Sequence, residues 1–212
     1  MELGGWMNMI YKICQWLSRL AYLNLLWLLF MFLGVLVVGA APSTAAMFTI
    51  IRKWVRGQYN VPIFRLFWET YQAEFKKANY LGAFIMMSLL LFWLSWHLIS
   101  SLEGTLVPIM MGVYLGIMAL WLVIMLYLFP VFVHYEGKAL QSVKKAFIIG
   151  ISYPFYTIRM IMAVAAALLV GMIFPGAGLL LTGSGIGFVL MYLANKVFRD
   201  IHERSGIQDV SL

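Results

Sequence analysis

The chain has 212 residues, of which 64% are hydrophobic and 11% are charged, and its formal net charge is +7. Soluble domains are roughly 45–50% apolar and about 25% charged, so this composition excludes an ordinary soluble protein and indicates a membrane protein. The basic residues lie between long apolar runs, a pattern typical of loops on the cytoplasmic side of a membrane, so we expect no nucleic-acid partner.

All fifteen Lys and Arg residues can be placed on one side of a membrane. They fall into four clusters, which are Lys12 with Arg19, residues 52–77, residues 138–159 and residues 196–204. Basic loops are enriched on the cytoplasmic side of membranes. The pattern therefore predicts a multi-pass protein of the bacterial plasma membrane, with both termini in the cytoplasm.

The first part of the chain predicts an interfacial helix over residues 5–19 and a helical hairpin over residues 20–55. Residues 5–19 carry apolar side chains at helical spacing on one face and polar ones opposite, which suits the headgroup layer. Residues 20–38 are long enough to cross a bilayer. Gly39 to Pro42 predict the turn, with Pro42 in the first turn of the returning helix, where its missing N–H costs nothing.

The returning helix leaves two topologies open, because residues 42–55 would measure only about 21 Å as a helix. If this segment lies on the cytoplasmic surface, the chain has five spans, and Lys12 and Arg19 lie outside. If it crosses the membrane, the chain has six spans and every basic residue lies inside. The distribution of positive charge favours six spans.

The remainder of the chain repeats the arrangement of an interfacial helix followed by a hairpin. Hydrophobic periodicity predicts interfacial helices over residues 62–78 and 138–151, and turns near Gly104 and Pro175. The predicted hairpins and tail are residues 80–134, 159–197 and 198–212. We therefore predict an all-α polytopic membrane protein with about six transmembrane helices in three hairpins, forming a single domain over residues 1–212.

The sequence predicts no catalytic, cofactor or metal site, and we expect the protein not to be an enzyme. The predicted spans carry no acidic or basic residue at their central depth, which argues against a proton-coupled pump. His97, His134 and His202 lack the spacing of a metal-binding pair. No serine has a plausible histidine and acid on the same face of a helix.

Two groups of residues are candidates for packing or binding. Gly183 and Gly187 form a small-xxx-small pair typical of close helix packing, as do Gly112 and Gly116, and Gly39 and Pro42 are the candidate turn residues. Glu69 and Glu136 are acids on interfacial segments and can pair with basic neighbours. A candidate docking surface for a partner protein lies on the second interfacial helix and comprises Phe64, Phe67, Trp68, Glu69 and Tyr71.

The chain resembles the YesL family of bacterial integral membrane proteins over nearly all of its length. The similarity is most specific in residues 39–57, where Gly39 and the run Pro42–Phe48 lead to Arg52–Lys53 and Arg56–Gly57. The helix from Phe67–Trp68 to Phe75–Lys77 is also similar to the family. The chain departs from the pattern at Ala41, where the family has glycine. Members are often encoded beside ABC-type sugar importers, so the resemblance implies a link to carbohydrate uptake.

Three functional hypotheses follow. The first is a non-enzymatic membrane protein that assists or regulates an ABC-type sugar importer, with the lipid bilayer and the importer's membrane subunits as partners. The second is a small permease or channel for a neutral solute, which would require a homo-oligomer. Its polar lining would come from Asn24, Ser88, Ser95, Thr182, Ser184 and Asn195. The third, a membrane enzyme acting on lipid or glycan, lacks a catalytic constellation.

Overall fold

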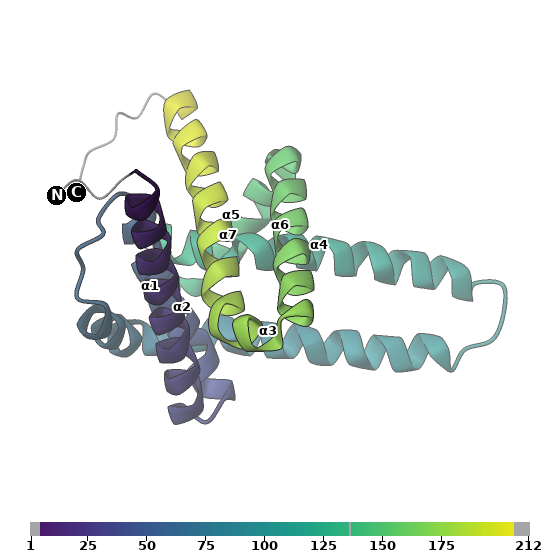
Figure 1. Cartoon of the computed structure of the whole chain (residues 1–212). Coiled ribbons are helices and arrows are strands. Elements are labelled where there is room, and N and C mark those ends of the chain that lie inside the picture. The colour runs from purple at the N-terminus through teal and green to yellow at the C-terminus, as the bar shows by residue number, and fades with distance from the viewer. Residues whose placement is uncertain (1–4, 136, 206–212) are drawn as a thin grey trace.

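The structure of the chain, a computed structural model, describes residues 5–135 and 137–205. Within these ranges the chain forms seven α-helices and no strand. The helices are α1 (Gly5–Leu33), α2 (Val37–Val55), α3 (Ile63–Ser100), α4 (Val107–His134), α5 (Ala139–Ser152), α6 (Pro154–Ile173) and α7 (Pro175–Ser205). In Figure 1, α1, α6 and α7 stand upright, whereas the distal parts of α3 and α4 run side by side away from them.

Five helices in the described part of the chain are long and apolar enough to cross a membrane. These candidate spans are Trp6–Leu33, Ile63–Ser100, Val107–His134, Pro154–Ile173 and Leu180–Glu203. The structure thus confirms the predicted all-α polytopic membrane protein. α2 is not one of the five, since its 19 residues include serine, threonine, Arg52 and Lys53.

α2 runs back along α1 from the turn at residues 34–36. The indole Nε1 of Trp27 donates a hydrogen bond to Thr44 Oγ1 at 3.0 Å, and the rings of Trp16 and Trp54 lie 5.8 Å apart. The basic C-terminal end of α2 therefore lies beside the part of α1 that carries Lys12 and Arg19. The six-span topology requires such a return, although many residues of α2 are buried within the protein.

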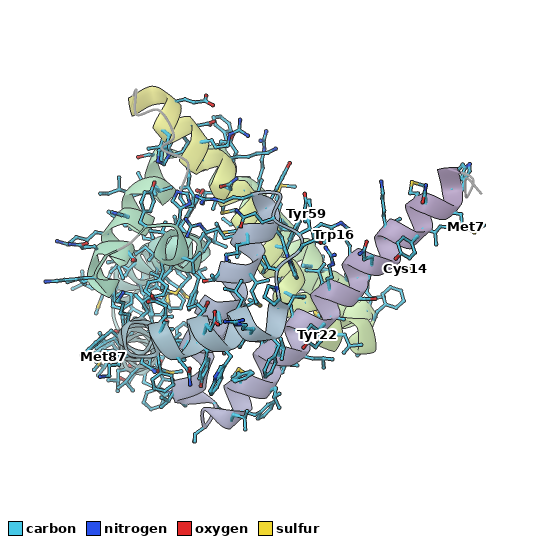
Figure 2. All side chains as sticks on the ribbon, turned by 90° about the vertical axis from the view of Figure 1, so that its left-hand side faces the viewer. Met7, Cys14, Trp16, Tyr22, Tyr59 and Met87 are labelled. Atoms are coloured by element: carbon cyan, nitrogen blue, oxygen red, sulfur yellow. The ribbon has the colours of Figure 1, made fainter. Side chains whose placement is uncertain are left out.

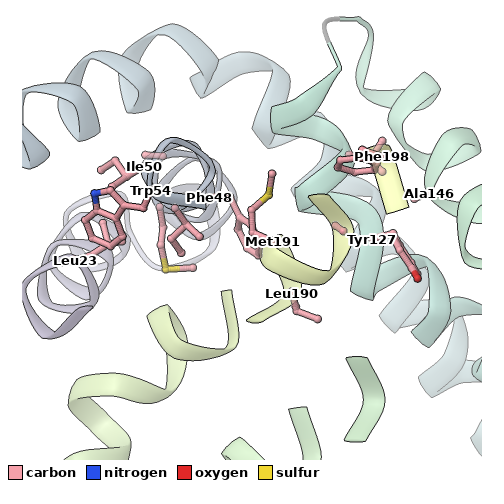
Figure 3. Close-up of a cluster of buried hydrophobic side chains, with 14 of the residues drawn as sticks. Leu23, Phe48, Ile50, Trp54, Tyr127, Ala146, Leu190, Met191 and Phe198 are labelled. Carbon is pink, nitrogen blue, oxygen red and sulfur yellow. The ribbon is translucent and has the colours of Figure 1, made fainter. Parts of the chain in front are cut away.

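The core is built around α2, which packs against α1, α3, α4 and α7. More than half of the residues of α2 are buried: residues 39–46 are small and allow close approach, and the buried residues after them are large and apolar. Figure 3 shows the core continuing from Leu23 and Trp54 past Phe48 and Met191 to Tyr127 and its neighbours on α5 and α7. α2 is thus the scaffold that fixes the positions of the surrounding helices.

The first hairpin turn lies earlier than predicted, and Pro42 is inside α2 rather than in its first turn. The chain reverses at Val35 and Leu36, which have positive φ angles of 57° and 52°. Gly34 and Gly39 allow this because their backbones touch: a Cβ on Gly39 would lie 2.8 Å from the Cα of Gly34. The prediction failed because β-branched and bulky residues rarely adopt this conformation.

The first two predicted interfacial helices are not separate elements. Residues 5–19 continue without a break into the predicted first span as α1, and residues 62–78 continue into the next span as α3. Neither junction contains glycine or proline, so nothing interrupts the helical hydrogen bonds. Figure 2 shows the N-terminal part of α1, with Met7 and Cys14, projecting away from the rest of the molecule.

The third interfacial helix does remain separate, as α5. It ends at Ser152 because Pro154 restricts the backbone of the preceding residue. α6 then begins at Pro154, five residues before the predicted start, and the turn to α7 lies at Phe174, so that Pro175 is already helical. α7 runs through the first part of the predicted tail 198–212, of which residues 206–212 lie outside the described residues.

Candidate functional site

The basic ends of several helices converge around His134, the last residue of α4. Arg52 and Arg56 from the end of α2, Lys145 from α5 and His202 from α7 all act electrostatically on the His134 ring. Phe198 packs against that ring, with 4.2 Å between the centroids. Three of the sequence's basic clusters therefore meet at one place, which we call the basic end.

Beside the basic end lies a cleft of about 390 Å³ between α2, α3 and the end of α4, which we call the polar cleft. Its volume falls in the range of roughly 300–1,000 Å³ that is typical of small-molecule sites. The cleft is lined by both cations and carboxylates, by two hydroxyl groups and by the aromatic ring of Tyr135. Its polar lining residues from α2 and α3 are Thr49, Arg52, Glu69, Thr70, Glu74 and Lys77.

Internal contacts hold the charged residues of the polar cleft. The Arg52 guanidinium donates a hydrogen bond to the carbonyl of Val133 in the last turn of α4, where the helix dipole favours a cation. Lys77 Nζ lies 3.7 Å from Glu74 Oε1, and Arg65 Nε lies 2.7 Å from Glu69 Oε1. Exposed pairs of this kind contribute little to stability, so these side chains remain available to a ligand.

Tyr135 separates the polar cleft from Lys145. The Lys145 ammonium lies 4.3 Å from the centre of the Tyr135 ring, a cation–π contact. Burial raises the pKa of the Tyr135 phenol. The hydroxyl group is therefore protonated at neutral pH and can donate a hydrogen bond as well as accept one.

A second cavity adjoins the polar cleft and is mostly apolar. It has a volume of about 470 Å³ and lies between α3 and α5. Lys77 and Gly137 line both cavities, so the two are adjacent. We call the second cavity the apolar groove; its remaining lining residues are Tyr80, Leu81, Phe84, Lys138, Ala139, Leu140 and Val143.

Comparison with known proteins identifies the family. A family model described as a protein of unknown function, DUF624, matches residues 20–96. The chain is 31% identical over 197 residues to the uncharacterized protein YesL of Bacillus subtilis (strain 168), and these residues are 93% of this chain and 93% of YesL. The chain belongs to the YesL family. The region matched by the family model includes the α2 and α3 walls of the polar cleft.

Two further YesL-family relatives come from the same organism. The uncharacterized protein YteU is 32% identical over 206 residues, which is 97% of this chain and 92% of YteU. The uncharacterized protein YesV is 35% identical over 200 residues, which is 93% of this chain and 96% of YesV. No solved structure matches this YesL-family chain.

The docking surface predicted for this YesL-family protein is divided between core and surface. Phe67 and Tyr71 are buried, and their rings lie 5.1 and 5.2 Å from that of Phe30 on α1. They cannot bind a partner directly, which corrects their assignment. Phe64 and Trp68 are 52% and 40% exposed, so docking through these residues and Glu69 stays a prediction. Glu136 lies outside the described residues.

The predicted packing glycines of this family member occupy three different environments. A Cβ on Gly183 would lie 2.5 Å from Asn24 Oδ1, so α1 and α7 are in close contact there. Gly187 faces the flexible ends of Ile51 and Met47, at 3.0 and 3.2 Å. Gly112 and Gly116 meet nothing within 4 Å, so this pair does not pack inside the chain as a helix-packing motif would.

Sequence reasoning missed the polar cleft of the YesL-family fold. A usable signal was present on α3, where Thr70, Glu74 and Lys77 follow at i, i+4 and i+7 and form a polar stripe beside the aromatic one. Thr49 and Arg52 give the matching i, i+3 pair on α2. No group of three His, Cys, Asp or Glu side chains that could hold a metal occurs within residues 5–135 and 137–205.

Proposed function

We propose that this protein is a non-enzymatic plasma-membrane protein that binds the membrane subunits of an ABC-type sugar importer and thereby assists or regulates carbohydrate uptake. The link to sugar import comes from the resemblance to the YesL family. The observation that carries a binding role is the distal part of the α3–α4 hairpin, which extends away from the other helices (Figure 1). A protruding apolar hairpin offers a large surface to a membrane partner.

The distal hairpin has apolar side chains exposed on several sides. On α3, Met87, Leu91 and Trp93 are more than half exposed, and on α4 the same is true of Ile109 and Val113. The two helices are also loosely packed, because a cavity of about 360 Å³ lies between them. The Trp121 indole donates a hydrogen bond to Ser88 Oγ across it at 2.9 Å. The hairpin is thus held together locally and leaves its outer faces to lipid or a partner.

Gly112 and Gly116 supply the contact surface that we propose for the partner. A pair of glycines four residues apart lets another transmembrane helix approach closely, so that packing and weak hydrogen bonds drive association in lipid. Both glycines lie on α4 with open space around them. An importer helix that packs on this surface would lie parallel to the distal part of α4.

The alternative of a neutral-solute permease has less support from the arrangement of the polar residues. Ser184 N–H donates to Asn24 Oδ1 at 3.0 Å, and Ser184 Oγ donates to the carbonyl of Leu20 at 2.9 Å. Ser88 bonds to Trp121 in the distal hairpin. The polar residues that a path would need are therefore divided between separate helix contacts.

The test is capture of the tagged protein in mild detergent from its native cell, grown on different sugars, with quantification of the copurifying importer membrane subunits. We expect the Gly112→Leu/Gly116→Leu variant to recover at least about tenfold less of these subunits, as loss of roughly 1.4 kcal/mol of binding energy would produce. The added side chains would fill the surface that the partner helix approaches.

The matched control is Val113→Leu/Ile117→Leu, which changes two exposed positions on the same helix without filling the glycine surface. We expect this variant to recover the importer subunits at the level of the unmodified protein. Absence of importer subunits under every growth condition would contradict the accessory role. Flux of a sugar into liposomes that contain only this protein would instead support the permease.

A further inference from the structure

The polar cleft and the apolar groove are adjacent, and we call the pair the amphipathic cavity. Lys77 and Gly137 belong to the lining of both, so the boundary between polar and apolar surface falls at these residues. On one side of this boundary lie the hydroxyl and charged groups of α2 and α3, and on the other lie the apolar side chains of α3 and α5. A ligand that fills both parts must itself have a polar and an apolar portion.

The apolar part suits a hydrocarbon chain. Leu81 is buried at the base of the groove, and Phe84 and Val143 are partly buried beside it. Tyr80 and Leu140 are exposed and form the outer walls. Because the groove is open to the surroundings of α3 and α5, a lipid chain can enter it from the bilayer without crossing the protein core.

The charges at the boundary favour a phosphate. Lys77 and Lys138 come from different segments, and both line the apolar groove. Arg52 lines the adjoining cleft, and Arg56 and Lys145 lie nearby at the basic end. The carboxylates of Glu74 and Glu69 are already paired, with Lys77 and Arg65 respectively. The two cavities are nevertheless lined by three cations, Arg52, Lys77 and Lys138, against the two carboxylates, so the described lining carries a net positive charge.

We propose that this cavity binds one anionic glycerophospholipid. The phosphate lies beside Lys77 and Lys138, the remainder of the headgroup enters the polar cleft toward Arg52, and one acyl chain occupies the apolar groove. Basic pockets between helices at the cytoplasmic level recognise anionic headgroups in this way. The bound lipid would fasten α5 to α3 across the open face between them.

The test is native mass spectrometry of the purified full-length protein, titrated in detergent with phosphatidylglycerol and, separately, with phosphatidylcholine. We expect one phosphatidylglycerol to be retained at least about tenfold more strongly than phosphatidylcholine, because the choline ammonium cancels the phosphate charge of phosphatidylcholine. Each Lys near a headgroup with a net negative charge contributes about a further fivefold. We expect Lys77→Gln/Lys138→Gln to reduce phosphatidylglycerol retention to the level of phosphatidylcholine.

The matched control is Lys76→Gln/Lys144→Gln, which removes the same charge from exposed positions on α3 and α5 that do not line the cavity. We expect it to retain phosphatidylglycerol within about twofold of the unmodified protein, because lysines that do not line the cavity lack the fivefold effect of a lysine beside the headgroup. Leu140→Glu places a charge in the hydrocarbon site at an exposed position, and we expect it to release the lipid although both lysines remain.

Three results would overturn the proposal. Equal losses in the two double-glutamine variants would mean that the lipid is held by the general surface charge. Unchanged retention in Lys77→Gln/Lys138→Gln would exclude the lysine pair. Displacement of phosphatidylglycerol by glycerol phosphate at equal concentration would show that the cavity recognises a soluble phosphate ester. Thermal unfolding of each variant is measured by size-exclusion chromatography after heating. A variant that loses the lipid but unfolds at the same temperature as the unmodified protein has lost the binding site and not the fold.

Discussion

At the scale of single residues, Gly183 shows how one missing side chain determines a helix contact. Asn24 on α1 is buried, and its carboxamide oxygen accepts a hydrogen bond from Ser184 on α7. This contact exists because position 183 has no Cβ. The sequence indicated that Gly183 serves close packing, but it did not indicate Asn24 as the partner, because the two residues come from opposite ends of the chain.

We expect Gly183→Ala to destabilise the protein by about 1–3 kcal/mol, because the new methyl group would overlap Asn24 and Trp27 and force α1 and α7 apart. The measurement is thermal unfolding in detergent. Gly185→Ala is the control: a Cβ there meets nothing within 4 Å, so it should be neutral or stabilising by roughly 0.5–1 kcal/mol through helix propensity. Equal destabilisation by both substitutions would contradict the α1–α7 contact.

At the scale of elements, the turn between α1 and α2 positions the scaffold helix of the core. Three consecutive residues reverse the chain, and Gly34 and Gly39 lie in backbone contact across the turn. Within the first turns of α2, Ser43 Oγ donates a hydrogen bond to the carbonyl of Gly39 at 2.7 Å, next to Pro42, which has no N–H to donate. Sequence reasoning placed the turn at residues 39–42, with Pro42 at the start of the returning helix. The chain instead reverses at residues 34–36, and Gly39 already lies inside α2.

We expect Gly39→Ala to be more destabilising than most surface substitutions, by at least about 1–3 kcal/mol. A Cβ at this position would lie 2.7 Å from the carbonyl oxygen of Met31 and 2.8 Å from that of Phe30, and backbone atoms cannot move aside as side-chain ends can. Expression and thermal unfolding in detergent measure the effect. Gly116→Ala, which meets nothing within 4 Å, serves as the comparison, and a Gly39→Ala protein equally stable to it would refute the close turn.

At the scale of the whole molecule, α1 and α7 run antiparallel, so that the start of α1 and the end of α7 lie at the same end of the fold (Figure 1). α2 returns along α1 and brings its basic residues to that end as well. An even number of crossings, as in the six-span topology, would give this arrangement. However, α2 is not among the five helices of the described residues that are long and apolar enough to cross, so the number of spans stays a prediction. Which side of the membrane the basic end faces stays a prediction from the positive charge.

We expect a membrane-impermeant maleimide to leave Cys14 unmodified in intact cells and to label it after permeabilisation. Cys14 is exposed, so access is limited by the membrane rather than by burial. In a Cys14→Ser/Ser101→Cys variant the thiol lies in the exposed α3–α4 loop, which the six-span topology places outside the cell, and it should react in intact cells. Labelling of Cys14 from outside would reverse the predicted orientation.

Sequence alone determined the membrane class, the helical content and most helix positions of this protein. An apolar run long enough to cross a bilayer, such as residues 107–134, forms a helix in lipid without the help of tertiary contacts, so it can be recognised from the local sequence. The separation of α5 from α6 was also predictable, because Pro154 acts on the residue beside it. The candidate packing glycines were identifiable for the same reason, as each is a property of one helix face.

Only the tertiary structure decided which of these faces meet. Phe67 and Phe64 lie on the same predicted stripe, yet only Phe67 is in the core. The ring of Phe30 on α1 lies 5.1 Å from that of Phe67 and 6.4 Å from that of Phe64, which stays 52% exposed. The polar cleft likewise requires α2, α3 and the end of α4 together, and no local pattern specifies that Arg52 reaches the carbonyl of Val133. Such contacts depend on how rigid helices pack in three dimensions, which the periodicity of a single helix does not encode.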